Sequence, residues 1–458
     1  MGSSAGTAVV LFTRDLRVHD QPALAAAARA ERVVPLFVFD ERILGTAFAP
    51  PNKVGFLIES LVDLDRSLGE LGGGLVTRRG SVVREAVTLA AQVGAETLFV
   101  SEDVSAYAQE RQRLLGEACR ERGIELVLAP GITVVPPGAV APASGGSHYY
   151  RVFSPFWRHW ERTELRAVEP VPERVPLPEG LERGLLPEPG ELAPGERAPA
   201  AAPGGETEGR ALARRWYQDG LRHYGARRGD LGSEGVSRLA PYLHFGCVSP
   251  LELVRVARGR PGADAWIRQL CWRDFYHHLL AADPELPRVD FRDRGDAFRE
   301  DPSGLAAWKE GRTGYPIVDA GMRQLLHEGY MHNRARLITA SFLTKHLYID
   351  WRAGAEHYYA HLTCGNVASN VGNWQWVAGT GVDTRQYRVY NPTLQAQRHD
   401  AGGDYVRRYV PELAGIEGKA VHEPWKLDAA TRTGLDYPEP IVEHLEAVRR
   451  FREARRKD

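Results

Sequence analysis

The spacing of apolar residues changes part-way along the chain, and this change limits the folds open to it. Up to about residue 130, short apolar runs, as at 9–12 and 33–39, alternate with longer amphipathic segments, as at 53–71. Such strand–helix alternation predicts a parallel, doubly wound sheet. The other expected strands and helices of this part are 22–30, 75–78, 82–92, 97–100, 106–122 and 125–128.

From about residue 211 onward, apolar residues recur instead at steps of three and four. That period predicts helices, which we expect at 265–281, 315–328, 333–348 and 354–362. Residues 131–210 are rich in Pro, Gly, Glu and Ala, as expected of a connection over the surface, and an aromatic island at 149–158 should dock on a domain. We therefore expect an α/β domain over 1–130, a linker over 131–210 and an all-helical domain over 211–458.

Composition restricts the function classes. A net charge of −1 over 458 residues means that any nucleic-acid site must be a local basic patch. The four cysteines lack metal-ligand spacing, which is typical of reduced thiols in a cytoplasm, and no metal is expected. No apolar run is long enough to cross a membrane. The chain also lacks a G-x-G-x-x-G after the first strand and a Walker phosphate loop.

Two local features suggest contact with a ligand. Arg14 and Asp15 follow the first expected strand, where parallel sheets bind ligands, although an internal Arg–Asp pair that orders the loop is the alternative. Trp374 and Trp376 follow Asn370 among small residues, which we interpret as a glycine-bracketed turn packed against a flat ligand. The alternative is a tryptophan-rich helical core.

Several longer motifs then occur in order along the chain. They are Arg14-Asp-Leu-Arg, Ser237-Arg-Leu-Ala-Pro-Tyr-Leu-His-Phe-Gly, Trp272-Arg-Asp-Phe-Tyr, Thr313-Gly-Tyr-Pro-Ile-Val-Asp, Met331-His-Asn-Arg-Ala-Arg, Asn370-x-x-Asn-Trp-Gln-Trp-Val-Ala-Gly and His422-Glu-Pro-Trp-Lys. Together they resemble the photolyase/cryptochrome family, most closely its bacterial class I cyclobutane pyrimidine dimer photolyases. The resemblance covers nearly the whole chain, including the order of α/β domain, linker and helical domain.

The resemblance implies FAD bound in the helical domain and a pyrimidine dimer flipped out of UV-damaged DNA into a cavity over the flavin. Light-excited reduced flavin would donate an electron to the dimer, while the protein positions both and tunes the cofactor. By match to the family motifs, the FAD contacts are Tyr224, Val236, Ser237, Arg238, Leu239, Ala240, Trp272, Arg336, Cys364, Gly365, Asn366 and Asn370. Asn370 would face flavin N5, with a structural amide that caps a helix or turn as the alternative.

The same match assigns the substrate side. Trp272 and Trp376 would flank the flipped dimer, because flat aromatic faces suit unstacked bases. The implied catalytic set is Trp272, Gln269, Asn333, Trp376 and Asn370. The residues implied at the DNA are Arg228, Gln269, Asn333, Arg334, Trp376 and Gln395, with Arg388 as a further phosphate contact. Each arginine has a surface or flavin-pyrophosphate role as its alternative, and Asn333 has a core hydrogen bond.

The sequence departs from the family pattern at several of these positions. The phosphate loop, Val236-Ser-Arg-Leu-Ala240, lacks two hydroxyls of the usual T-S-x-L-S, each worth roughly 1.5–3 kcal/mol as a hydrogen bond to a charged acceptor. Gln269 stands where many members carry a glutamate, and an amide cannot supply a proton. His332-Asn333 stands where the (6-4) branch usually has His-His, which favours cyclobutane dimers as substrate.

Two more departures concern the flavin and its reduction. The usual D-G-D is Cys364-Gly365-Asn366, so Arg336 loses its carboxylate and should raise the flavin reduction potential, unless Cys364 is merely a small buried residue. Trp374 and Trp351 match the proximal and middle members of the family's electron-transfer chain, but the distal position is Phe298. Because benzene is much harder to oxidise than indole, we expect photoreduction that is slow or rerouted through Trp308, Tyr348 or Tyr358.

The sequence thus predicts a light-driven lyase that repairs cyclobutane pyrimidine dimers, acting as a cytoplasmic monomer on the DNA of a bacterial nucleoid. The α/β domain would hold an antenna chromophore, either a deazaflavin or methenyltetrahydrofolate. The alternatives are a cryptochrome-like blue-light sensor without repair activity, a lyase for another lesion such as the (6-4) product, and a flavoprotein whose FAD site has decayed.

Overall fold

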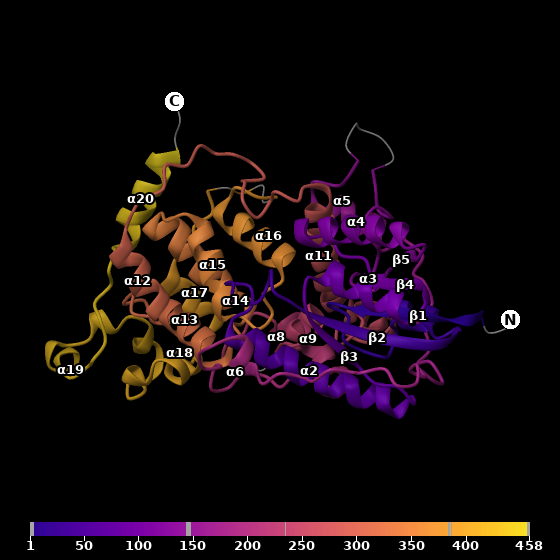
Figure 1. The fold of residues 1–458 in the computed structure, drawn as a ribbon. Helices are drawn as coiled ribbons and strands as arrows, with labels where there is room; N and C mark the ends of the chain where they lie inside the picture. The colour runs from indigo at the N-terminus through magenta and orange to yellow at the C-terminus, as the bar shows by residue number, and fades with distance from the viewer. Residues whose placement is uncertain (1–3, 143–147, 234, 383–384, 386, 456–458) are drawn as a thin grey trace.

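An α/β part lies beside a helical part in the structure, a computed structural model that describes residues 4–142, 148–233, 235–382, 385 and 387–455 (Figure 1). The α/β part contains a five-stranded sheet in the order β3-β2-β1-β4-β5, and every neighbouring pair is parallel. Its strands are β1 (Ser4–Phe12), β2 (Ala30–Asp40), β3 (Val76–Gly80), β4 (Ala95–Ser101) and β5 (Glu125–Ala129). The predicted doubly wound sheet is confirmed, with several strand ends shifted.

Helices cover both faces of this sheet, which is why its strands are apolar on both sides. They are α1 (Pro22–Ala27), α2 (Pro51–Glu70), α3 (Val82–Gln92) and α4 (Ala106–Glu121). Val10 and Phe12 of β1 share a core with α1 and α2, whereas Val9 and Leu11 share a second core with α3 and α4. The first core continues into the helical part, so the α2 face of the sheet joins the two parts of the molecule.

The connection between the two parts is anchored along its length. It contains α5 (Phe153–Trp160) and α6 (Pro189–Leu192). The aromatic island docks as predicted, because the ring of Phe156 packs on that of Phe275 with 5.2 Å between centroids. Further along, the backbone N–H of Thr77 donates to the carbonyl of Arg183 at 2.6 Å, so the connection covers the exposed edge of β3.

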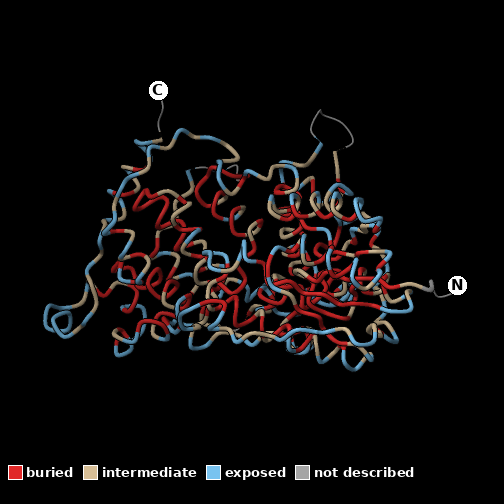
Figure 2. Tube along the Cα trace, in the orientation of Figure 1, coloured by how far each residue is buried: buried red, intermediate tan, exposed pale blue. Residues whose placement is uncertain are grey.

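The helical part contains no strand among its described residues, as predicted. Its α-helices are α7 (Glu206–Arg215), α8 (Tyr224–Arg227), α9 (Ala240–Phe245), α10 (Pro250–Ala257), α11 (Ala263–Ala282), α12 (Pro302–Glu310), α13 (Pro316–Glu328), α14 (Asn333–Ser341), α15 (Trp351–His361), α16 (Val367–Ala378), α17 (Pro392–His399), α18 (Asp404–Tyr409), α19 (Ala429–Thr433) and α20 (His444–Arg455). The helix expected at 333–348 is present as α14 followed directly by a π-helical turn over Phe342–Leu347. Buried residues concentrate where these helices meet one another (Figure 2).

The interpretation of the tryptophan stretch as a glycine-bracketed turn is wrong. Trp374 and Trp376 lie inside α16, which continues until Gly379 adopts a φ of 84°. Gly372 is needed within this helix because Tyr276 of α11 packs onto its Cα, and a Cβ there would lie 2.1 Å from the tyrosine ring. The small residue Gly372 therefore serves close helix packing, and the stretch is helical, as the alternative held.

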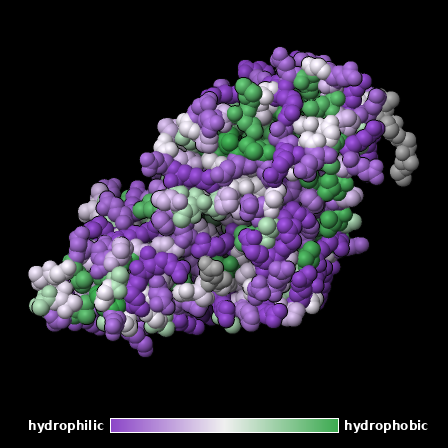
Figure 3. Space-filling model, turned by 90° about the horizontal axis from the view of Figure 1, so that it is seen from below, coloured by the Kyte–Doolittle hydropathy of each residue, from purple (hydrophilic) through white to green (hydrophobic). Residues whose placement is uncertain are grey.

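The surface shows separate apolar patches with hydrophilic residues between them. In the view from below, no single apolar band crosses the face (Figure 3). Among the described residues, no helix combines the length and the apolar character needed to span a membrane.

Candidate functional site

Helix α16 contacts both α11 and α14, and these three helices carry all five predicted catalytic residues, Gln269, Trp272, Asn333, Asn370 and Trp376. The contact between α11 and α16 is close where Tyr276 meets Gly372, and Tyr276 Oη donates to Asn373 Oδ1 at 3.4 Å. This packing fixes the spacing between the two helices that present the predicted substrate-stacking indoles.

Each of these two indoles is half-buried and supported by a flat partner. The Trp272 ring lies parallel to that of Phe153 from the connection, with 3.6 Å between centroids and 6° between planes. The guanidinium of Arg388 lies 5.4 Å from the centroid of the Trp376 ring. Sequence reasoning missed Phe153, although the aromatic island around it was a visible signal. Stacking of this kind limits the orientations that an indole can adopt, so both rings are held ready for a planar ligand.

The opposite side of α16 is buried. Asn370 and Trp374 lie one turn apart on it, and Asn370 Nδ2 donates to the carbonyl of Ala355 on α15 at 3.2 Å. Asn370 does not cap α16, because Asn366 occupies that position and accepts from the N–H of Ser369 at 2.9 Å. The alternative of a capping role for Asn370 is therefore wrong, and its amide is held by tertiary contacts with α15.

Arginines gather around His332 at the start of α14. Burial, and then Arg336, Arg334 and Arg238, lower the pKa of His332 to about 4, so this imidazole is neutral at pH 7. Its Nδ1 caps α14 by accepting from the N–H of Arg334 at 3.1 Å, and its buried Nε2 has no partner among the described residues. The concentration of cations creates a positive potential that suits a polyanion.

Arg336 has a thiol where the family pattern has a carboxylate. Its Nη2 lies 3.2 Å from Cys364 Sγ, and its Nε donates to the carbonyl of Met331 at 2.8 Å. The ring of Tyr330 lies between two guanidinium groups, with Arg238 at 4.8 Å and Arg336 at 5.8 Å from its centroid. Within the described chain, no carboxylate forms an ion pair with Arg336. Cys364 is a small buried residue, as one interpretation held, and its thiol also contacts Arg336, as the other requires.

Asn366 replaces the second carboxylate of the family pattern, and its neighbours accommodate a neutral amide. Because Asn366 Oδ1 caps α16, its Nδ2 is left to donate to His277 Nε2 at 3.3 Å. The other ring nitrogen of His277 then donates to the carbonyl of Arg273 at 2.8 Å. This network requires a neutral imidazole, and burial followed by the charge of Arg273 holds the pKa of His277 well below its usual value.

A lysine from the α/β part reaches the same place, and no pattern in the sequence indicates this contact. Lys53 of α2 is 5% exposed, and its Nζ lies 5.3 Å from the centroid of the Tyr359 ring. A Cβ built on Gly365 would lie 2.6 Å from that Nζ. Burial lowers the pKa of Lys53 to about 8, and no described carboxylate forms an ion pair with it. Lys53 and Arg336 thus bring two cations beside the loop of Cys364 and Gly365.

The predicted phosphate loop leads into α9. Arg238 adopts a φ of 52°, which is uncommon for a non-glycine residue, and its Nη1 donates to Glu328 Oε2 at 2.8 Å. Ser237 Oγ accepts from the indole N–H of Trp266 at 3.4 Å. Val236 is half-buried, Leu239 is buried and Ala240 is exposed.

Tyr224, the remaining predicted contact of the cofactor, begins α8, which packs on α11. Burial raises the pKa of its phenol to about 12, so the group is a neutral hydrogen-bond donor at pH 7.

The residues predicted at the DNA lie on several elements. Gln269 precedes Trp272 by one turn of α11, and its Nε2 donates to the carbonyl of Ala265 at 3.4 Å. Asn333 begins α14 and is exposed, so the alternative of a core hydrogen bond is wrong. Arg228 is exposed directly after α8, and Gln395 is half-buried on α17, which packs on α14.

The predicted proximal indole has aromatic neighbours that are themselves buried. The Trp374 ring lies 4.9 Å from that of Tyr358 and 6.1 Å from that of Trp308, measured between centroids. Tyr358 Oη lies 2.6 Å from Thr339 Oγ1, and the indole N–H of Trp308 donates to the carbonyl of Thr339 at 3.0 Å. Two of the three residues expected for rerouted photoreduction therefore contact Trp374.

The middle and distal positions of the predicted electron-transfer chain, Trp351 and Phe298, lie outside this aromatic cluster. Trp351 begins α15 and is fully buried. Phe298 contacts Tyr348 with 5.6 Å between ring centroids, and Tyr348 is the third residue expected for rerouting. Among the described ring pairs, none joins Trp351 to either of them.

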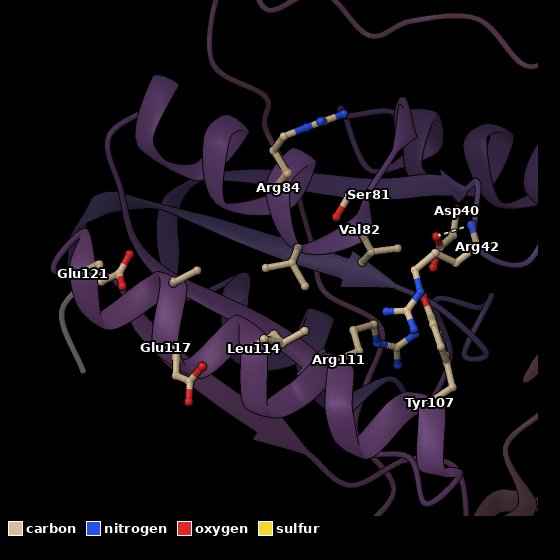
Figure 4. Close-up of a pocket in the computed structure, with 12 residues that line it drawn as sticks. Asp40, Arg42, Ser81, Val82, Arg84, Tyr107, Arg111, Leu114, Glu117 and Glu121 are labelled. Atoms are coloured by element: carbon tan, nitrogen blue, oxygen red, sulfur yellow. Dashed lines mark hydrogen bonds between the residues drawn. The ribbon is translucent and has the colours of Figure 1, made fainter.

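A separate crevice of about 410 Å³ lies at the carboxyl edge of the sheet, between α3 and α4 (Figure 4). Arg42 and Arg111 place their guanidinium groups 5.2 and 5.7 Å from the centroid of the Tyr107 ring. Arg111 is 8% exposed, and its Nε and Nη2 have no partner in the described structure. Asp40 accepts from the N–H of Arg42 at 3.0 Å and leaves its buried Oδ2 without a described partner. Open donors and an open acceptor thus face one cavity.

The residues after β1 serve structure. Arg14 Nη2 donates to Asp103 Oδ1 at 2.8 Å. Asp15 is fully buried and accepts from Gln21 Nε2 and Ser101 Oγ at 2.6 Å. The loop is therefore ordered by internal partners, although the arginine pairs with Asp103 and not with Asp15.

Comparison with known proteins gives concordant matches. The chain matches the family model described as the FAD binding domain of DNA photolyase over residues 266–457, and that of DNA photolyase over residues 8–178. It is 48% identical over 452 residues to the deoxyribodipyrimidine photo-lyase of Streptomyces griseus, covering 98% of this chain and 99% of the relative. The structure is similar to a bacterial class III photolyase from Agrobacterium tumefaciens, with a TM-score of 0.91, 32% identity and coverage of 99% and 98%. It is also similar to an archaeal photolyase from Sulfolobus tokodaii with two FAD molecules, which imply a light-harvesting cofactor, with a TM-score of 0.85, 29% identity and coverage of 98% and 99%.

Proposed function

This chain belongs to the photolyase/cryptochrome family, and on that premise we propose that it repairs cyclobutane pyrimidine dimers in DNA by light-driven electron transfer, with FAD as its cofactor. The observation that carries this proposal is the pairing of two supported, half-buried indoles, Trp272 and Trp376, with a nearby group of arginines around His332. A planar substrate and a polyanionic backbone need these two features together.

The residues at the helical site fit FAD. An anionic flavin ring needs a cation beside it, and Arg336 has no carboxylate partner in the described chain. A flavin ring needs hydrogen-bonding groups at its edge. The amide of Asn370 can supply one, and Trp374, one turn further along α16, has a buried indole N–H without a described partner. We assign Arg336, Asn370, Tyr224 and the 236–240 loop to holding the cofactor. Bound FAD supplies the light-excited electron donor that opens the cyclobutane ring.

The remaining residues bind and orient the lesion. Trp272 and Trp376 stack on the flipped bases, and each such stack contributes roughly 1–3 kcal/mol. Gln269 donates its amide to a base carbonyl, since it lies one turn from Trp272 on the same helix. Arg334 and Arg228 contact phosphates on either side of the lesion and set the position of the strand.

A repair assay tests this proposal. The purified, FAD-loaded protein is chemically reduced and given an oligonucleotide with a single thymine dimer, and dimers are counted after blue light and in a dark control. Light-dependent loss of dimers is expected. No loss of dimers with reduced flavin bound would overturn the proposal. Two alternatives would then remain: the sensor function, which the departures at Cys364, Asn366 and Phe298 favour, and repair of the (6-4) product. The same assay with a second oligonucleotide, containing a (6-4) product, tests the latter.

A matched pair of indole variants sharpens the assay. Trp376→Ala should weaken binding of dimer-containing DNA by roughly 1–3 kcal/mol, which is about 5- to 150-fold. Trp425→Ala is the control, because this half-buried indole packs on Tyr315 away from α16. Equal losses in both variants would show that the effect is not stacking on the lesion.

We further propose that the crevice at the sheet edge holds the antenna chromophore, a deazaflavin or methenyltetrahydrofolate. Both are flat, conjugated rings with hydrogen-bonding edges, which suit the open donors of Arg111 and the open acceptor of Asp40. Each compound is added to the FAD-loaded protein, and energy transfer is read from the excitation spectrum of flavin photoreduction. Arg111→Met should abolish the transfer, whereas Arg113→Met should not, because Arg113 does not line the cavity and is bonded to Glu110 and Glu117.

The proposed setting is a reducing cytoplasm, with the protein acting as a monomer on DNA in the nucleoid. The free, buried state of all four cysteines supports a reducing compartment. Size-exclusion chromatography with light scattering tests the monomer, and a dimer mass would contradict it.

A further inference from the structure

The indole N–H of Trp351 is bonded to a carboxylate, unlike those of the neighbouring buried tryptophans. Trp351 Nε1 donates to Asp290 Oδ1 at 2.8 Å. The indole N–H of Trp374 is buried without a described partner, and that of Trp308 meets a backbone carbonyl, which cannot take up a proton. Of these three indoles, Trp351 is therefore the one whose hydrogen-bond partner is a base.

Arg352 strengthens this arrangement in two ways. Its Nη2 donates to Asp290 Oδ1 at 3.0 Å, which holds the carboxylate against the indole. Its guanidinium also lies 4.6 Å from the centroid of the Trp351 ring. A positive charge so close to the ring opposes a second positive charge on the ring itself. An oxidised Trp351 that kept its proton would be such a charge, so the site favours loss of that proton.

We propose that Asp290 accepts the indole proton of Trp351 when this residue is oxidised, and that electron transfer in the protein ends there. The inference rests on the proposed function and extends it to the reduction of the flavin. Bound FAD, in its oxidised form, would supply the light-driven oxidant that takes one electron from Trp374, and Trp351 would then pass one electron to Trp374. The Nε1–H bond of Trp351 breaks and an O–H bond forms on Asp290. The products are a neutral indolyl radical and a neutral carboxylic acid.

The proton transfer matters because the usual next step, electron transfer from a distal indole to Trp351, is missing. Phe298 has no indole to oxidise, so the positive charge would otherwise remain within reach of Trp374 and return. Once the proton lies on Asp290, an electron can return to Trp351 only if the proton returns as well. The Asp290 side chain is 13% exposed, so its proton can pass on to solvent, and an added thiol can later reduce the radical.

A tyrosine offers the competing end point. Tyr348 Oη donates to Asp296 Oδ1 at 3.0 Å, and this carboxylate is 1% exposed and paired with Arg455. Tyr348 contacts Phe298 and, among the described ring pairs, has no contact with Trp351. The direct hydrogen bond at Asp290 therefore makes Trp351 the expected end point.

The test is time-resolved absorption after a blue flash on the protein loaded with oxidised FAD, comparing the wild type with Asp290→Asn and Asp296→Asn. In the wild type the signal of an oxidised indole should convert to that of the neutral indolyl radical, more slowly in D₂O than in H₂O. Asp290→Asn keeps the hydrogen bond but cannot take the proton, so the neutral radical should disappear and the charge-separated state should shorten by about tenfold or more. Asp296→Asn should match the wild type.

The outcomes separate the two proposals. An unchanged lifetime in Asp290→Asn, a tyrosyl signal that is lost in Asp296→Asn, or no isotope effect in the wild type would overturn the inference. The isotope effect needs no variant, so it holds even if a substitution disturbs folding. A wild-type protein that binds FAD but shows no oxidised indole would also overturn the inference, whereas one that binds no FAD would instead count against the proposed function. Phe298→Trp should move the final radical from Trp351 to residue 298, which places the end point independently.

Discussion

Two arginines near the sheet edge, Arg14 and Arg166, differ in their partners from two in the helical site, Arg334 and Arg336. At the sheet edge, Arg14 pairs with Asp103 and Arg166 pairs with Asp20, in each case with a carboxylate that is almost fully buried. In the helical site, Arg336 meets a thiol, and Arg334 forms no ion pair within the described chain. Half-buried cations without a carboxylate leave part of their charge uncompensated, which is unfavourable unless an anion binds. The paired arginines therefore stabilise the fold, whereas Arg334 and Arg336 are available to the anionic ligands that the proposed function requires.

Removing Arg336 should have the largest effect. Arg336→Met should weaken FAD binding by roughly 1.5–3 kcal/mol, or about 10- to 150-fold, because a charged hydrogen-bond donor is lost. The measurement is FAD content after purification and titration of the FAD-free protein. Arg14→Met is the matched control, since it should lower the free energy of unfolding and leave FAD affinity unchanged. If both variants bound FAD equally well, the distinction between the two groups would fail.

The pH dependence of stability should show that burial and the surrounding arginines keep His332 neutral. Its pKa is about 4 in the fold and about 6.5 when unfolded, so between these values the unfolded chain binds a proton that the folded protein does not. The free energy of unfolding should fall as the pH drops from 6.5 to 4, by at most about 3 kcal/mol from this residue. His332→Asn keeps a capping side chain for α14 and removes the titration. Urea unfolding followed by circular dichroism should then show a shallower pH dependence in the variant, and an unchanged slope would contradict the assignment.

Placing a carboxylate at position 364 should give Arg336 an ion-pair partner, as Asp103 is for Arg14. Cys364→Asp should lower the flavin reduction potential, because a negative charge disfavours the added electrons. A change of about 1.4 kcal/mol corresponds to about 30 mV for a two-electron couple. Potentiometric titration measures it, with Cys364→Ser as the neutral control. A potential that stays equal or rises in the aspartate variant would refute the charge argument.

The smallest expected effect concerns a single phosphate contact. Arg334→Gln should weaken binding to dimer-containing and to undamaged DNA alike, and it should reduce the slope of log affinity against log salt by about 1. Arg166→Gln removes a paired arginine and should leave that slope unchanged. Fluorescence anisotropy at several salt concentrations distinguishes the two. A slope that is unaltered in Arg334→Gln would place Arg334 away from the DNA backbone.

The sequence by itself determined the architecture. The change from strand–helix alternation to a helical period is a local property, and it separates the sheet from the helices. It also showed which side chains depart from the family pattern, since Cys364, Asn366 and Phe298 are visible without coordinates. The error over the tryptophan stretch arose because glycine marks both turns and close helix contacts, and only the position of Tyr276 distinguishes them.

Only the tertiary structure decided how these departures are accommodated. Burial and the charge of Arg273 keep His277 neutral, so that it can accept from Asn366, and the cation Lys53 comes from a helix in the other part of the chain. The carboxylate beside Trp351 lies in the segment before α12, far from that tryptophan in sequence. Partners of this kind depend on packing between segments that are distant in sequence. The period of the apolar residues indicates only which face of a helix or strand is buried, and it does not identify the residues that pack against that face.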